Sequence, residues 1–183
     1  MQEQGRRPHF SLLIPRAVIE HTVSRLAMEI AEDYREKDLV ALGILKGAFI
    51  FMADLVRQVG IPLEVDFITV SSYGSGTESS RAITMHQDLT TEVRGKDVLI
   101  IEDIIDSGHT LCYVIEHLAG KGARSVRLCA LVDKPSRRER NLEIDYLGFT
   151  VPDKFIVGYG LDFDNKFRYL PDIYAMETPD AEE

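Results

Sequence analysis

The chain has 183 residues, which is enough for one domain built around an ordinary hydrophobic core. Hydrophobic residues make up 45% of the sequence and charged residues 28%, a composition that excludes disordered, collagen-like and disulfide-scaffold classes. The net charge of −9 argues against a broad surface for DNA, RNA or acidic lipid, because such surfaces are basic. An anion bound by this chain must therefore be held by local groups or by a metal ion.

The cysteines and the apolar runs of the sequence indicate the cellular location of the protein. Cys112 and Cys129 each lie in an apolar stretch, where a buried reduced thiol is commoner than a disulfide or a metal site. The apolar run from Phe10 to Ile14 is too short for a signal sequence, and no run approaches the roughly 18 residues of a membrane span. We expect a cytoplasmic protein that neither crosses nor binds a membrane.

The first half of the chain predicts a helix, a strand and a second helix. After Pro15, a helix is predicted because apolar residues recur at helical spacing, at Ile19, Val23, Leu26, Ala27 and Ile30. The continuous apolar run LVALGIL at 39–45 predicts a strand that ends in a sharp loop at Lys46 and Gly47. A second helix, ended by Gly60, is predicted from the spacing of Phe49, Met52, Ala53, Val56 and Val59.

A third segment, from Pro62 to about residue 71, predicts a strand with one wet face. In it, Leu63, Val65, Phe67 and Thr69 alternate with Glu64, Asp66, Ile68 and Val70. From Ser71 the composition changes to SSYGSGTESS, which has little to bury. Composition alone favours a plain solvated connection here over a mobile lid.

The second half predicts further strands and one helix. Strands are expected at 98–101, 125–132, 144–149 and 155–157. A helix that begins within 102–110 should bury Leu111, Val114, Ile115 and Leu118. A charged turn follows Pro135, at residues 137–140. Alternating strands and helices predict an α/β domain with a mainly parallel sheet. Ligands of such sheets bind at the carboxyl ends of the strands, so Lys46, residues 102–110 and residues 133–134 should converge.

The segment IIEDIIDSGHT, residues 100–110, carries the strongest chemical signal. Its short turn joins a buried strand to a helix, so that backbone amides and hydroxyls can surround a phosphate at the helix N-terminus. A simple turn capped by Asp106 or Ser107 accounts for the capping equally well. It does not account for Glu102 and Asp103, which are costly to bury and would repel a phosphate.

A phosphorylated sugar with magnesium reconciles the acids with the phosphate pocket. A vicinal diol donates hydrogen bonds to carboxylates, and a divalent cation neutralises their charge. The sequence has neither the lysine pattern of a nucleotide-hydrolysing P-loop nor the glycine-rich dinucleotide fingerprint, so those two classes lack their motif.

IIEDIIDSGHT resembles the phosphoribosyl-pyrophosphate motif of type I phosphoribosyltransferases, specifically the hypoxanthine-guanine phosphoribosyltransferases. Five further segments occur in that family's order, namely LKG at 45–47, SSYGSGTESS at 71–80, VDKPSRR at 132–138, PDKFIVGYGLDF at 152–163 and FRYLPDIY at 167–174. The resemblance implies a twisted, mainly parallel sheet flanked by helices, with a small hood built from the terminal segments. It also implies a single domain over 1–183, in which a mobile lid at about 71–84 replaces the plain connection.

The resemblance assigns roles to individual residues. Glu102 and Asp103 would bind the ribose hydroxyls, partly through Mg²⁺, and Asp162 would be a further magnesium ligand. The 5-phosphate would be bound by the amides and hydroxyls of Asp106, Ser107, Gly108, His109 and Thr110. Asp106 would also be the catalytic residue, accepting or relaying the proton of the purine imidazole ring. His109 departs from the family's frequent lysine, so its side chain is not expected to be catalytic.

The same resemblance predicts the pyrophosphate and purine contacts. Pyrophosphate would be bound by Lys46, Gly47, Arg168, Ser72 and Tyr73, and the Leu45–Lys46 peptide bond would be cis. The purine would be bound by Lys134, Phe155, Ile156, Ile104 and Asp162. Lys134 would donate to the 6-oxo oxygen, which excludes adenine, because its 6-amino group is also a donor. Without the resemblance, Phe155 and Ile156 are typical core residues, and Asp162 and Arg168 a typical surface acid and ion pair.

The implied enzyme is a purine salvage transferase. It would move the 5-phosphoribosyl group from phosphoribosyl pyrophosphate to hypoxanthine or guanine, giving IMP or GMP and pyrophosphate. Two alternatives stay open, an enzyme that also accepts xanthine and a non-enzymatic nucleotide sensor on the same fold. By analogy with relatives, we expect a homodimer or a homotetramer.

Overall fold

The larger sheet of the protein is predominantly parallel. The computed structural model describes residues 9–73 and 82–177. Within these ranges the sheet has the order β4-β3-β2-β5-β6-β7. Its strands are β2 (Leu39–Leu45), β3 (Glu64–Tyr73), β4 (Ala82–Gln87), β5 (Asp97–Ile105), β6 (Ser125–Asp133) and β7 (Tyr146–Thr150). All neighbours are parallel except β3 and β4, which are antiparallel. The predicted α/β architecture is confirmed.

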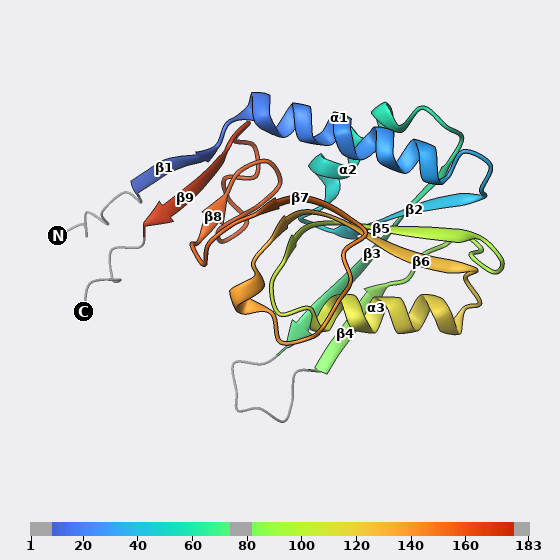
Figure 1. Ribbon diagram of the computed structural model, residues 1–183. Coiled ribbons are helices and arrows are strands. Elements are labelled where there is room, and N and C mark those ends of the chain that lie inside the picture. Colours follow the sequence, from blue (N-terminus) through green and yellow to red (C-terminus); the bar gives the residue numbers. More distant parts are fainter. Residues whose placement is uncertain (1–8, 74–81, 178–183) are drawn as a thin grey trace.

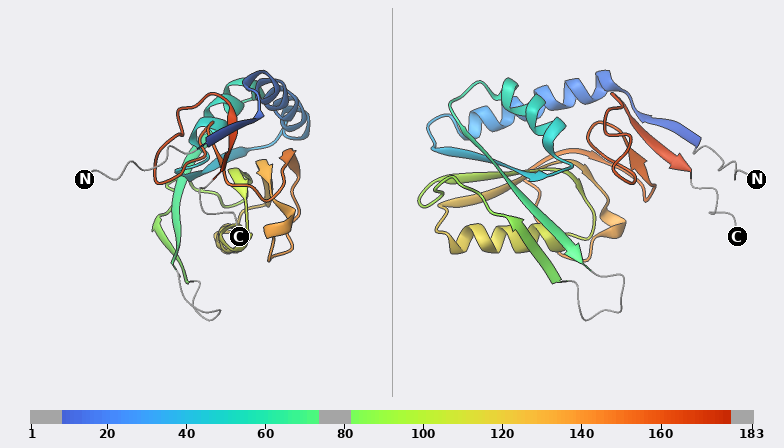
Figure 2. Two further views of the ribbon diagram at one scale, coloured as in Figure 1. Left: turned by 90° about the vertical axis from the view of Figure 1, so that its left-hand side faces the viewer. Right: turned by 180° about the vertical axis from the view of Figure 1, so that it is seen from behind.

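Helices cover both faces of this sheet (Figures 1 and 2). Helices α1 (Arg16–Asp33) and α2 (Phe49–Val59) lie on one face, and α3 (His109–Gly120) lies on the other. Successive side chains of β5 enter opposite cores, Leu99 on the α1 and α2 side and Ile100 on the α3 side. Because β5 is buried on both faces, any polar residue near its carboxyl end is also enclosed.

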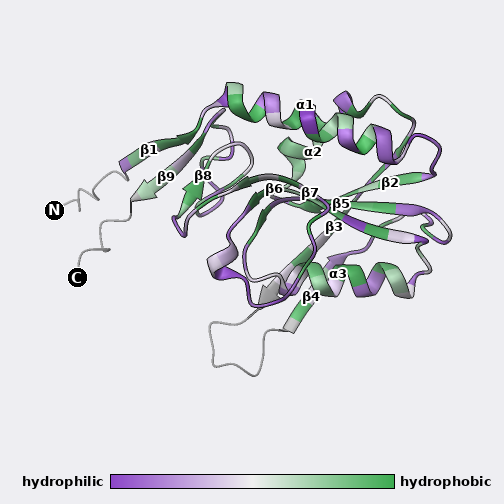
Figure 3. Cartoon of the chain, viewed as in Figure 1, coloured by the Kyte–Doolittle hydropathy of each residue, from purple (hydrophilic) through white to green (hydrophobic). Residues whose placement is uncertain are grey.

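The predicted helices occur at the expected positions, but the buried face of α2 differs from the prediction. All five apolar residues predicted to face inward on α1 are buried, and Gly60 ends α2 in the left-handed conformation, with φ 71°. On α2, however, Phe49 and Ala53 are exposed, whereas Phe51 and Leu55 are buried. The α2 sequence is apolar around most of its circumference, so spacing alone did not fix the buried face. Figure 3 shows hydrophobic colour along the central strands and mixed colour along α1.

The prediction that β3 has one wet face is wrong. Phe67 packs against the core under α1 and α2, while Ile68 is fully buried in the core on the α3 side and Val65 is exposed. Because helices cover both faces of the sheet, side chains that point to either face of β3 can be buried.

Strands frame the segment predicted to be a lid. Residues 71–73 belong to β3 and residues 82–84 to β4, with Ser72 paired to Ile83 and Tyr73 to Ala82. The predicted loop is therefore shorter than 71–84 at both ends, and its central part, 74–81, lies outside the described residues.

A second, smaller sheet joins the two ends of the described chain. It has the order β1-β9-β8, from β1 (His9–Ile14), β8 (Ile156–Val157) and β9 (Ile173–Glu177), and all its pairs are antiparallel. Figure 1 shows it beside the α1 and α2 side of the larger sheet. It is the predicted hood, and it includes Ile156 of the purine-binding prediction, while Phe155 directly precedes β8.

Two further predictions concern the cysteines and the membrane. Cys129 is buried, which raises the pKa of its thiol, whereas Cys112 is only partly buried, and both are unbridged. In the part of the chain that the structure describes, no helix is long and apolar enough to cross a membrane.

Candidate active site

The turn between β5 and α3 forms a small cavity without using a side-chain cap. The N-cap of α3 is Gly108, with φ 86°, and no side chain caps the helix, so the interpretation of Asp106 or Ser107 as N-cap is wrong. A Cβ at Gly108 would lie 2.9 Å from Leu142, and only glycine combines this approach with a positive φ. The amides of the first helical turn have no partner within the helix. The turn lines a cavity of about 220 Å³ together with Glu102.

Glu102 and Asp103 lie within β5, which runs on to Ile105 and is longer than predicted. As consecutive strand residues they project to opposite faces of the sheet. Glu102 lines the cavity at the turn, and its Oε2 atom is buried with no hydrogen-bond partner among the described residues. Burial, followed by the neighbouring Asp103, raises the pKa of Glu102 well above its ordinary value. An uncompensated buried acid of this kind is unusual unless a ligand satisfies it.

Asp103 lies on the other side, against the loop that follows β2. It is only 6% exposed, and burial raises its pKa to about 6, although the backbone amide of Ile104 donates to it at 2.9 Å. A Cβ at Gly47 would lie 2.1 Å from Asp103 Oδ2, so any larger residue at Gly47 would displace the acid. The Leu45–Lys46 peptide bond is cis, as the resemblance implies. The predicted pyrophosphate loop therefore lies directly against one of the predicted acids.

Asp162 and Arg168 meet each other at this side of the site. Arg168 Nη2 lies 2.6 Å from Asp162 Oδ1, and its Nη1 donates to the carbonyl of Gly160 at 2.6 Å. Arg168 lowers and Asp162 raises the pKa of Asp103, but burial and backbone hydrogen bonds have larger effects on it. The ion pair was the alternative to a functional role for these two residues. It adjoins the loop at Gly47, because Arg168 is hydrogen-bonded to Gly160 and a Cβ at Gly160 would lie 2.6 Å from the carbonyl oxygen of Gly47.

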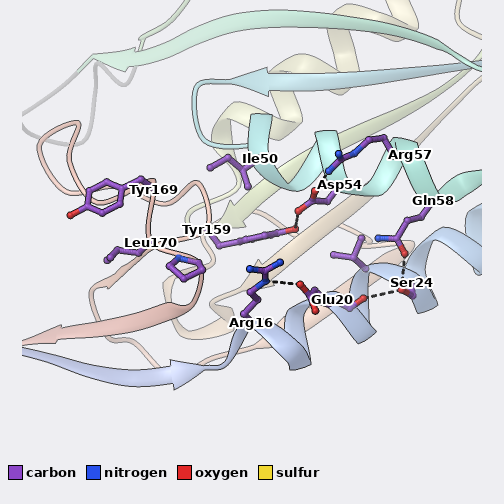
Figure 4. A pocket seen from close by; sticks show the side chains of 12 residues that line it. Arg16, Glu20, Ser24, Ile50, Asp54, Arg57, Gln58, Tyr159, Tyr169 and Leu170 are labelled. Carbon is purple, nitrogen blue, oxygen red and sulfur yellow. Dashed lines mark hydrogen bonds and ion pairs between the residues drawn. The ribbon is translucent and has the colours of Figure 1, made fainter.

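The loop that carries Asp162 is anchored on α2. Figure 4 shows Tyr159 directed toward Asp54, and its hydroxyl donates to Asp54 Oδ2 at 2.6 Å. This contact borders a cavity of about 530 Å³ between α1, α2 and the loop. Although this cavity is larger than the one at Glu102, its polar groups bind one another, as Arg16 with Glu20 and Ser24 with Gln58 show. The cavity therefore supports the loop and leaves no unsatisfied acid.

The predicted purine-binding residues lie on two adjoining segments. Lys134 follows β6, is 9% exposed, and donates from Nζ to the carbonyl of Lys154 at 2.6 Å. Burial lowers the pKa of Lys134, and the nearby Asp106 and Asp153 oppose this shift. Phe155 precedes β8, is 45% exposed, and meets the ring of Phe163 edge to face at 5.3 Å.

Two other residues predicted to bind the purine, Ile156 and Ile104, are less exposed than Phe155. Ile156 is buried in the small sheet, where it pairs with Ala175, and Ile104 is partly buried in β5. Ile156 can therefore offer a ligand its backbone edge more readily than its side chain. An exposed phenylalanine such as Phe155, next to a buried lysine, is instead the arrangement expected for stacking and donation to a planar ring.

Three contacts of the turn were missed by sequence reasoning. Arg137 Nε lies 3.2 Å from Asp106 Oδ1. His109 Nε2 lies 2.9 Å from Glu139 Oε2, and Arg140 Nε donates to His109 Nδ1 at 3.2 Å. The charged turn at 137–140 was visible in the sequence, and its charge opposite Asp106 was the available signal. His109 thus has partners in the structure on both ring nitrogens.

The acids do not form a complete metal centre by themselves. Across residues 9–73 and 82–177, no group of three or more His, Cys, Asp or Glu side chains is arranged to hold a metal ion. Glu102, Asp103 and Asp162 approach from different faces and loops. Mg²⁺ commonly uses one or two carboxylates together with water and phosphate oxygens, so this donor set fits an ion that arrives with a phosphorylated ligand.

Comparison with known proteins identifies the family of the chain. The family model for the phosphoribosyl transferase domain matches residues 16–164. The chain is 48% identical over 162 residues to a hypoxanthine phosphoribosyltransferase of Escherichia coli (strain K12), covering 87% of this chain and 91% of that protein. It is 46% identical over 166 residues to a hypoxanthine-guanine phosphoribosyltransferase of Bacillus subtilis (strain 168), covering 91% and 92%.

The fold is also similar to solved structures. A crystal structure of a hypoxanthine phosphoribosyltransferase from Staphylococcus aureus superimposes with a TM-score of 0.89 at 39% identity, covering 94% of both chains. A hypoxanthine-guanine phosphoribosyltransferase from Bacillus anthracis gives 0.87 at 36% identity, covering 93% of this chain and all of that one. Motif, fold and relatives agree along most of the sequence, and the chain belongs to the phosphoribosyltransferase family, among the hypoxanthine and hypoxanthine-guanine phosphoribosyltransferases of purine salvage.

Proposed function

We propose that this chain transfers the 5-phosphoribosyl group from phosphoribosyl pyrophosphate to hypoxanthine or guanine, forming IMP or GMP and releasing pyrophosphate. The observation that carries the proposal is the buried Glu102 Oε2 without a partner, beside a helix N-terminus without a side-chain cap. Helix amides attract a phosphate, and an unsatisfied carboxylate accepts hydrogen bonds from a sugar diol. A phosphorylated ribose supplies both groups in one molecule.

The substrate would lie across the carboxyl ends of β2, β5 and β6. The turn from Asp106 to Thr110 would bind the 5-phosphate, and Glu102 and Asp103 the ribose hydroxyls. The pyrophosphate would be bound by Lys46, Gly47 and Arg168, with Ser72 and Tyr73 contributed by β3. The contact of Gly47 with Asp103 supports this arrangement, since it brings the pyrophosphate loop next to a ribose-binding acid.

Mg²⁺ is the proposed cofactor, held by Glu102, Asp103 and Asp162 together with oxygens of the substrate. The raised pKa values of the first two acids support a divalent cation, because a cation stabilises the ionised carboxylates that burial disfavours. When bound, Mg²⁺ supplies positive charge against the negative charge of the departing pyrophosphate. A cation that comes with the substrate also allows a chain of net charge −9 to bind a polyanion.

The protein's own groups would handle the rest of the charge. As the anomeric C–O bond breaks, pyrophosphate leaves with the electron pair, and the loop amides at Lys46 and Gly47 with Arg168 would stabilise it. The purine ring nitrogen forms the new C–N bond, and Asp106 would accept or relay the imidazole proton. Replacing Asp106 by Asn should therefore lower kcat more than it weakens binding of phosphoribosyl pyrophosphate.

Lys134 would select oxopurines. Its ammonium has three donors, of which one is used by the carbonyl of Lys154, so a donor is available for a 6-oxo oxygen. Adenine would place an amino group there and leave the lysine unpaired, a mismatch that discriminates strongly. Xanthine also has a 6-oxo group, so Lys134 does not discriminate against it.

The test offers the purified protein phosphoribosyl pyrophosphate and Mg²⁺ with hypoxanthine, guanine, xanthine or adenine, and follows ultraviolet absorbance. Turnover of hypoxanthine or guanine without adenine is expected. Turnover of xanthine would extend the substrate range, and turnover of none of the four would contradict the proposal in favour of a nucleotide sensor. Lys134→Ala should raise KM for both oxopurines, and unchanged KM values would remove the proposed contact.

Two further properties are proposed with the function. We propose a homodimer or homotetramer by analogy with relatives, to be tested by sedimentation. We also propose a cytoplasmic location, consistent with Cys112 and Cys129 being unbridged.

A further inference from the structure

Arg137 lies between two carboxylates that come from opposite sides of the proposed purine site. Its Nε is 3.2 Å from Asp106 Oδ1, in the turn after β5, and its Nη1 is 3.8 Å from Asp153 Oδ2. Asp153 stands two residues before Phe155, the proposed stacking residue. One guanidinium thus connects the turn that would bind phosphate with the segment that would bind the base.

The backbone that carries Arg137 is held against the same turn. Arg137 ends the short helix η1 (Pro135–Arg137), and its amide donates to the carbonyl of Lys134 at 3.0 Å. The amide of Lys134 donates to the carbonyl of Ile105 at 3.1 Å, and that of Glu139 to the carbonyl of Ser107 at 3.0 Å. Arg137 therefore starts from a backbone that is fixed on both sides to the residues flanking Asp106.

The contact engages only one oxygen of Asp106. Oδ1 faces Arg137, whereas Oδ2 accepts no hydrogen bond from residues 9–73 or 82–177. A carboxylate with one oxygen held and the other available is oriented to accept a single proton. Both side chains are 54% exposed, and an exposed ion pair adds little to stability. A contribution of this pair to fold stability is thus small, and its geometric effect is the larger consequence.

We propose that Arg137 is a positioning residue that orients Asp106 for proton transfer. It would hold Oδ1 so that Oδ2 takes the proton from the purine imidazole N–H, while the electron pair of that N–H bond stays on the ring and Arg137 remains protonated. The inference rests on the proposed function, because it requires Asp106 to handle the proton. Lys134 is the other cation near Asp106, and its proposed partner is the 6-oxo oxygen of the purine.

A double-mutant cycle tests this role. Arg137→Ala should lower kcat about tenfold with little change in KM for phosphoribosyl pyrophosphate, because misplacing a reacting group costs mainly the chemical step. Arg137→Lys should recover part of the loss, since it keeps the charge without the fork geometry. In an Asp106→Asn background, Arg137→Ala should have no further effect on kcat, because the two residues act as one unit.

The controls separate positioning from folding. Arg35→Ala removes an exposed arginine that pairs with Glu32 on α1, and it should leave both kcat and the unfolding temperature unchanged. Arg137→Ala should also unfold at the wild-type temperature.

Three results would overturn the inference. If Asp106→Asn lowers kcat but Arg137→Ala does not, Arg137 has no positioning role, while the proposed function stands. An equal loss from Arg137→Ala in both backgrounds would show that Arg137 acts independently of Asp106. An unchanged kcat in Asp106→Asn would contradict the proton role of Asp106 and the inference together.

Discussion

The two ends of β5 carry buried acids in opposite electrostatic conditions. At the amino end, Asp97 is 4% exposed and is bound by Arg124 and by Ser125 Oγ at 2.6 Å, and the hydrogen bond from Arg124 is the main cause of its lowered pKa. At the carboxyl end, Asp103 is 6% exposed and its pKa is raised to about 6, mainly by burial. The pKa values of two enclosed aspartates thus shift in opposite directions, because Asp97 is bound by an arginine, whereas Asp103 accepts a backbone amide hydrogen bond and the effect of burial on it is the larger one.

The difference indicates that the amino end of β5 contributes to stability and that its carboxyl end is the candidate for ligand binding. The acid at the amino end is satisfied within the fold, so it contributes to the stability of the free protein. The acids at the carboxyl end have raised pKa values, which costs stability when they are ionised, and the proposed ligand and Mg²⁺ would offset this cost. In parallel sheets the carboxyl ends are where ligands bind, and here that end carries the two acids whose pKa values are raised, Glu102 and Asp103.

The largest expected effect is on activity, and it should appear at one end of the strand only. Glu102→Gln combined with Asp103→Asn should lower kcat/KM by about 10²-fold or more, because the variant loses charges that would bind the ribose and Mg²⁺. Asp97→Asn should leave kcat/KM near the wild-type value in the folded fraction. Steady-state absorbance assays with hypoxanthine measure both, and comparable losses at the two ends would erase the distinction.

The next largest effect is on the free energy of unfolding, which should change in opposite directions for substitutions at the two ends of β5. Asp97→Asn should lower the free energy of unfolding by about 2 kcal/mol, because it removes a charge-assisted hydrogen bond from a buried group. Asp103→Asn should instead raise it at pH 7.5 by about 2 to 3 kcal/mol, the equivalent of the raised pKa. Urea denaturation of the ligand-free proteins tests the pair. A destabilised Asp103→Asn protein would show that Asp103 is already satisfied without ligand.

The smallest expected effect is a dependence of stability on pH, which should have opposite signs for Asp103 and Asp97. Because the folded state holds the proton of Asp103 more tightly, stability falls as pH rises from about 4 to about 6. The gain from Asp103→Asn should therefore be absent below pH 4 and complete above pH 6. Asp97 has a lowered pKa, so its stabilising contribution is present above its ordinary value of 3.8 and is lost at lower pH.

Denaturation midpoints measured from below about pH 3 to about pH 8 would show these opposite slopes. A gain from Asp103→Asn that is independent of pH would mean that protonation of this acid does not cause the effect, and would assign it to packing instead.

Local sequence patterns predicted the elements that place the site, because each depends on residues close together in the chain. The run at 39–45 and the apolar spacing of α1 were sufficient for β2 and α1. The convergence of Lys46, Asp106 and Lys134 followed from the rule that parallel strands end at one edge. The individual roles came from the resemblance to the family, and local patterns would not have assigned them.

What the patterns missed depends on contacts between distant residues. Strands β1 and β9 pair across most of the chain, with Phe10 opposite Met176, and neither is a strong strand signal by itself. The ion pairs of Asp106 with Arg137 and of Asp162 with Arg168 require knowledge of how loops face each other. The end of β5 was set too early, because Glu102 and Asp103 interrupt the apolar pattern although the strand continues through them.

The central claim is that the acids at the carboxyl end of β5, Glu102 and Asp103, bind the sugar and Mg²⁺ of the substrate. Calorimetric measurement of the binding of phosphoribosyl pyrophosphate with Mg²⁺ tests it most directly. Wild-type protein and Asp97→Asn should bind with similar affinity, while Glu102→Gln combined with Asp103→Asn should bind at least about tenfold more weakly. Equal affinity in all three proteins would contradict the account, because the acids at the carboxyl end of β5 would then have no part in holding the sugar or the ion.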